Sequence, residues 1–73
     1  MTERIVLGLK ERIDELVGNS LAKPFKMFGL NTFMIQANQA QIAGINRPEE
    51  GITEQEGDEL RKYILDKAES LKT

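Results

Sequence analysis

The strongest signal in the sequence comes from residues 27–46, MFGLNTFMIQANQAQIAGIN, which contain no charged side chain. Charged residues recur every few positions on both sides of this stretch. The outward face of a helix on a small soluble domain is normally charged, so an uncharged helical stretch is expected to be covered on most sides. The covering surface is either the rest of the chain or a second copy of it.

Two longer amphipathic helices are predicted to flank this stretch. Apolar residues recur at helical spacing from Thr2 to about Val17 and predict the first helix. The second is predicted from Thr53 to about Leu71, because Thr53 and Glu56 form a capping box. Residues 46–51 are turn-forming and charged, and they are interpreted as the connector that leads into this helix.

The middle of the chain is predicted to contain two helices. Proline is favourable only near the start of a helix, so Pro24 limits the first of them to residues 21–28. Gly29 is expected to break that helix. Asn31 is a suitable N-cap for the next one, which is predicted from Thr32 to about Ala43 and ends at Gly44.

These elements predict an all-α fold, a single helical domain of residues 1–73 with three to four helices in a small bundle. A chain of 73 residues buries a smaller share of its surface than a longer chain does. It also has no cysteine with which to form a disulfide. Good helix packing or oligomerisation must therefore supply stability, and we expect the bundle to assemble as a homo-oligomer.

The composition excludes several kinds of chemical site. Without histidine or cysteine the chain lacks imidazole bases, thiolate nucleophiles and the usual zinc ligands. The acidic run between residues 49 and 59 lacks the alternating oxygen ligands around a glycine that a calcium loop needs. We therefore expect no enzymatic activity, no cofactor and no bound metal.

The distribution of charge also bears on the location of the protein. Charged residues throughout residues 3–15 argue against a secretory signal, and the many amides of residues 27–46 argue against a membrane span. A formal net charge of −2 with interspersed signs predicts no general affinity for anionic lipid or for nucleic acid. We expect a cytoplasmic protein that does not bind membranes.

The candidate contact residues lie within the uncharged stretch and just before it. Ala37, Ala40 and Gly44 would form a smooth strip that another helix could approach closely. An amide such as Gln41 can hydrogen-bond to a partner without the desolvation cost of a charge. Phenylalanine and methionine are well suited to protein contacts, although most of them are expected in the core. The full set of candidate contact residues is Phe25, Phe28, Phe33, Met34, Ala37, Ala40, Gln41 and Gly44.

The predicted function is that of a small non-enzymatic protein–protein interaction module, acting as an adaptor, a regulator or inhibitor, or an assembly subunit. Its expected partners are other copies of itself and another protein.

The alternative hypothesis is a DNA-binding regulator of the helix-turn-helix kind. Residues 20–28, a turn at 29–31 and the amide-rich helix that follows have roughly this layout, and amide side chains can read adenine in the major groove. Pro24 argues against it, because the first helix of the motif should be continuous there. Few cations are available for phosphate contacts. The nearby ones are Lys23, Lys26 and Arg47.

Overall fold

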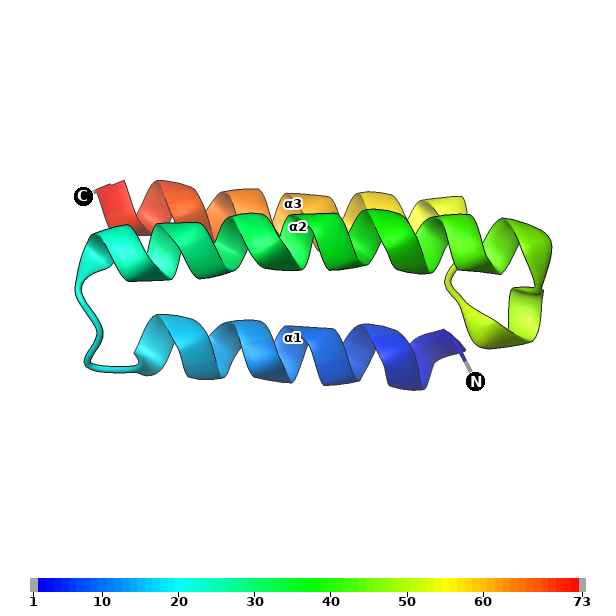
Figure 1. Ribbon diagram of the computed structural model, residues 1–73, viewed down its shortest axis with the longest axis horizontal. Coiled ribbons are helices and arrows are strands. Elements are labelled where there is room, and N and C mark those ends of the chain that lie inside the picture. The colour runs from blue at the N-terminus through cyan, green and yellow to red at the C-terminus, as the bar shows by residue number, and fades with distance from the viewer. Residues whose placement is uncertain (1, 73) are drawn as a thin grey trace.

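The computed structural model describes residues 2–72, which form three α-helices and one short 3-10 helix (Figure 1). Helix α1 spans Thr2–Gly18, α2 spans Lys23–Asn46, η1 spans Pro48–Glu50 and α3 spans Glu54–Lys72. Each long helix runs antiparallel to the one before it, in an elongated bundle with extents of 37 × 16 × 14 Å (Figure 1). The residues described contain no strand, so the predicted all-α fold is confirmed.

The core lies along the centre of the bundle, where all three long helices and the connector contribute apolar side chains. Its fully enclosed members come from α1, α2, the connector and α3, and the largest are Ile13, Leu30, Ile52 and Leu60. Half-buried residues such as Leu16 and Met27 pack around them. No charged or polar residue is buried among those described. The amphipathic helices predicted at each end of the chain therefore bury the expected apolar stripes.

The predicted break at Gly29 is wrong, because α2 runs without interruption from Lys23 to Asn46. A glycine inside a helix costs on the order of 1 kcal/mol relative to alanine but does not end it. Here it permits close packing against α1: a Cβ atom on Gly29 would lie 2.6 Å from Cδ2 of Leu16. Asn31 is consequently an exposed residue inside α2 and not an N-cap. Pro24 does occupy the first turn of the helix, as expected.

The connector after α2 folds back against the end of that helix. The backbone N–H of Ile52 donates a hydrogen bond of 3.0 Å to the carbonyl oxygen of Ala40. Gly44 and Gly51 allow this approach, since a Cβ atom on Gly44 would lie less than 3.0 Å from three backbone atoms of Ile52. The fold of the connector therefore depends on two glycines that have no room for a side chain.

Helix α3 begins with the predicted capping box. The backbone N–H of Glu56 donates to Oγ1 of Thr53 at 3.1 Å, and the backbone N–H of Thr53 donates to Oε1 of Glu56 at 2.9 Å. Gly57, in the first turn, is buried beside the side chain of Gln41. A Cβ atom on Gly57 would lie less than 3.0 Å from Oε1 of Gln41, so a larger residue there would require the Gln41 side chain to move.

Candidate interaction surface

The small-residue strip predicted for contact with another helix lies against the protein's own chain. Ala37 is completely buried. Ala40 accepts the hydrogen bond from Ile52, and Gly44 packs against the backbone of residues 51–52. The close backbone approach expected of these residues is present, and the segment that makes it is the connector.

Three more of the predicted contact residues are half-buried within the bundle. Phe33 and Met34 pack against the core, and the ring centroid of Phe33 lies 5.5 Å from the guanidinium carbon of Arg12. The side-chain oxygen Oε1 of Gln41 is buried against Gly57, with no hydrogen-bond partner among residues 2–72. Of the predicted set, Phe25 and Phe28 are the two that are strongly exposed.

The outward face of α2 carries a row of large apolar side chains that water can reach. We call it the outer stripe, and it consists of Phe25, Phe28, Ile35, Ile42 and Ile45. Their exposed fractions are 66%, 75%, 50%, 59% and 76%, so every one of them leaves at least half of its surface in water. The sequence-based prediction missed the three isoleucines.

A signal for the stripe was present in the sequence. Phe28, Ile35 and Ile42 are separated by seven residues each, which is close to two turns of an α-helix and places them on one side. The exposed polar residues between them include Thr32 and Gln39, and none carries a charge. The cores of protein–protein interfaces are likewise depleted of charged residues.

A shallow groove between α2 and α3 extends this apolar surface. Its volume is about 180 Å³, and its uncharged lining consists of Met27, Leu30, Asn31, Met34, Ile64, Leu65 and Ala68. Leu65 is itself exposed. Asn31 lies three residues after Phe28 and four before Ile35, so the groove opens beside the N-terminal half of the stripe.

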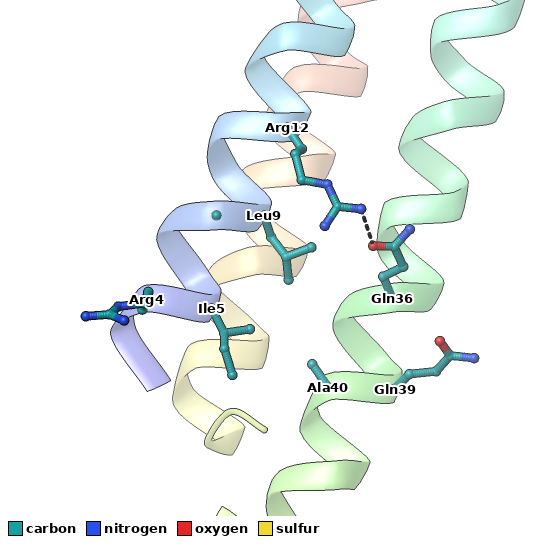
Figure 2. A pocket seen from close by; sticks show the side chains of 8 residues that line it. Arg4, Ile5, Leu9, Arg12, Gln36, Gln39 and Ala40 are labelled. Atoms are coloured by element: carbon teal, nitrogen blue, oxygen red, sulfur yellow. Dashed lines mark hydrogen bonds between the residues drawn. The ribbon is translucent and has the colours of Figure 1, made fainter. Parts of the chain in front are cut away.

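A second groove lies between α1 and α2 and has a volume of about 400 Å³ (Figure 2). Ile5, Leu9 and Ala40 contribute apolar side chains to it. Nη2 of Arg12 donates to Oε1 of Gln36 at 3.2 Å, whereas Arg4 points away from α2 (Figure 2). The two arginines do not converge on one point, so the groove lacks the arrangement that would hold an anion.

A polar cluster joins α1 to α3 on another part of the surface. The hydroxyl of Tyr63 donates to Oδ1 of Asp14, and Nζ of Lys67 lies 3.5 Å from the same oxygen. The hydrogen bond from Tyr63 lowers the pKa of Asp14, and the same bond raises the pKa of Tyr63. Asp14 and Tyr63 line neither groove described above, and we interpret the cluster as a brace between the two helices.

No group of three acidic side chains in residues 2–72 lies close enough together to hold a metal ion. None of the helices described has the length and apolar character needed to cross a membrane. The DNA-binding hypothesis requires a turn at residues 29–31, and α2 is helical throughout that segment.

No family model, curated protein or solved structure matches this chain.

Proposed function

We propose that this protein is a small non-enzymatic interaction module that assembles with other copies of itself through the outer stripe of α2. The observation that carries the proposal is the exposure of five large apolar side chains on one helix. Large apolar side chains that recur on one side of a helix and remain exposed are a common mark of a surface that contacts another protein. Roles as an adaptor, a regulator or inhibitor, or an assembly subunit are all compatible with this mode of contact.

The size of the stripe supports a specific contact. Aromatic side chains have about 150–250 Å² of surface each, so Phe25 and Phe28 expose on the order of 300 Å² between them. The three isoleucines are smaller but have larger exposed fractions in total, so they add a similar area and the stripe offers on the order of 600 Å² of apolar surface. Two copies would then bury roughly 1,200 Å² in total, which is the lower limit for stable protein–protein interfaces. Polar neighbours such as Gln39 would add to this area.

The absence of charge from residues 27–46 also supports self-association. A charged residue in a helix–helix contact has to lose water, and in a symmetric contact it can face a like charge from the second copy. The outer stripe has neither cost. Gln39 and Thr32 can instead form hydrogen bonds with the amides of a second copy.

Assembly would also compensate for a small core. The fully buried apolar residues of the monomer include only two from α2, Leu30 and Ala37, although α2 is the longest helix. Covering the outer stripe would remove more apolar surface from water. A second copy that binds only the folded chain, and not the unfolded chain, would also stabilise the fold by mass action.

The proposal is tested by placing a charge on the stripe. Ile42 on α2 and Leu7 on α1 are both 59% exposed, so Ile42→Glu and Leu7→Glu form a matched pair. We expect Ile42→Glu to raise the dissociation constant of the assembly at least tenfold in sedimentation equilibrium, while Leu7→Glu leaves it within about twofold. Equal effects of the two substitutions, or a monomeric parent protein at every concentration, would contradict the proposal.

A further inference from the structure

We propose that two copies pack their α2 helices antiparallel, about a twofold axis that passes beside Ile35, so that Phe28 of each copy faces Ile42 of the other. This inference rests on the proposed self-assembly and adds the partner's orientation and register. It follows from the spacing of the outer stripe and from the charges at the two ends of α2.

The spacing of the stripe is symmetric about Ile35. Phe28 and Ile42 lie seven residues before and after it, and Phe25 and Ile45 lie ten residues before and after it. In a contact with twofold symmetry, a residue of one copy that meets a given residue of the other is met by it in return. An antiparallel pair centred on Ile35 therefore brings phenylalanines level with isoleucines at both distances.

The position of the axis is fixed by the ends of the helix. Helix α2 has 24 residues, and at about 1.5 Å per residue it is about 36 Å long, close to the 37 Å length of the whole bundle. Centring the pair on Ile35 overlaps almost all of this length. An axis displaced by four residues toward either end would put Phe25 or Ile45 level with residues beyond the helix of the second copy.

Charges at the ends of α2 favour the antiparallel orientation. A parallel pair would also bring apolar residues level with one another, so the apolar spacing alone does not choose between the two. Lys23 lies at the start of α2, and Glu49 lies in η1 just beyond its end. Both are exposed, and neither has an ion-pair partner among residues 2–72.

An antiparallel pair places Lys23 of each copy near the end of the second helix that carries Glu49. A parallel pair would place Lys23 beside Lys23 and Glu49 beside Glu49, where like charges repel. The helix dipoles also favour the antiparallel pair, since in that pair the positive end of one α2 lies beside the negative end of the other. Opposite charges at each end thus select one of two otherwise equivalent arrangements.

The orientation can be measured with spin labels, because the natural chain has no cysteine. Ser20 is exposed in the loop between α1 and α2, outside the stripe. Labelled Ser20→Cys dimers should show a distance of about 40 Å between labels if the helices are antiparallel, and under about 20 Å if they are parallel. Labelled Lys62→Cys serves as the control, because Lys62 is exposed on α3 outside the stripe and its neighbour Arg61 bonds to Asn38 near the axis, so a dimer of either orientation should give a measurable distance.

A second measurement tests the register. In an antiparallel pair, Phe28→Glu in one copy faces Ile42→Lys in the other. Each variant alone should dimerise at least tenfold more weakly than the parent protein, whereas an equimolar mixture should recover at least tenfold in affinity as a heterodimer. Circular dichroism of each variant confirms that the helices remain folded.

The possible outcomes separate the two proposals. A long Ser20 distance together with recovery in the mixture supports the inference. A dimer with a short Ser20 distance, or a mixture that shows no recovery, overturns the antiparallel pairing and leaves self-assembly through α2 intact. The absence of any distance between labels at both positions, with a monomeric mass, overturns both.

Discussion

The hydroxyl of Tyr63 donates a hydrogen bond to the carboxylate of Asp14, and this bond joins α3 to α1 across 49 residues of sequence. The ring of Tyr63 also lies 5.2 Å from Nζ of Lys10 and 5.0 Å from Nζ of Lys67, measured to its centroid. Two cations beside one ring, with a carboxylate at its hydroxyl, form a compact electrostatic contact between the two helices.

This contact predicts how stability depends on pH. The pKa of Asp14 is lowered below 3.8 in the folded state. Its contribution to the free energy of unfolding is therefore present above pH 3.8 and is lost as the pH falls through the folded-state pKa. The pKa of Tyr63 is raised above 10.0, so its contribution is full below pH 10 and is lost as the pH rises through the folded-state value. We expect Tyr63→Phe to flatten both edges of the curve of melting temperature against pH. Identical curves for the two proteins would contradict this assignment.

The glycines at the connector predict a loss of stability without a change in mass. Gly44→Ala should lower the free energy of unfolding by about 1–3 kcal/mol, because its Cβ would press on the backbone of Ile52. A Cβ on Gly8, inside α1, meets nothing within 4 Å, so Gly8→Ala should stabilise by about 0.5–1 kcal/mol. Urea unfolding measures both changes. A lower particle mass for Gly44→Ala would mean instead that this residue forms part of an interface between copies.

The capping box of α3 gives a third prediction. Thr53→Ala removes the hydroxyl that accepts from the backbone N–H of Glu56, and it should destabilise the protein by about 1 kcal/mol. Ser20 provides the control, since it is exposed in the loop before α2, and the N-cap of that helix is Ala22. The melting temperature of Ser20→Ala should therefore lie closer to that of the parent protein. An equal loss in both variants would indicate that the cap contributes nothing of its own.

The fourth prediction is that the protein does not bind DNA, whereas the DNA-binding hypothesis predicts that it does. Helix α2 is continuous where that hypothesis needs a turn, and one of the three nearby cations, Lys26, already donates to the carbonyl oxygen of Val17 at 2.7 Å. We expect no measurable binding to random duplex DNA at low salt by fluorescence anisotropy. Binding that weakens steeply with added salt, and that is lost when Lys23 and Arg47 are replaced by alanine, would revive the DNA-binding hypothesis.

Much of the fold could be predicted because its signals are local. The apolar spacing of α1 and the hydroxyl and carboxylate of Thr53 and Glu56 act within a few residues, so the sequence contains all of the relevant information. Gly29 was misinterpreted for the opposite reason. It permits the approach of Leu16, a contact between two helices that sequence periodicity does not reveal.

The candidate surface was predicted only in part. Small residues favour close packing, but their pattern does not say which segment approaches, and here residues 51–52 occupy the strip at Gly44. The outer stripe has a weak signal in the sequence, because amide residues occupy the turns between Phe28, Ile35 and Ile42 and interrupt the apolar pattern. Phe25 and Phe28 belong to both the predicted contact set and the outer stripe.

Self-association through the outer stripe can be measured from the mass of the unaltered protein in solution. Light scattering on a sizing column, over a hundredfold range of concentration, gives that mass without a label or a substitution. Self-association predicts the mass of a dimer or larger assembly at high concentration, against the 8.3 kDa of one chain. A well-folded particle with the mass of one chain at every concentration would contradict it.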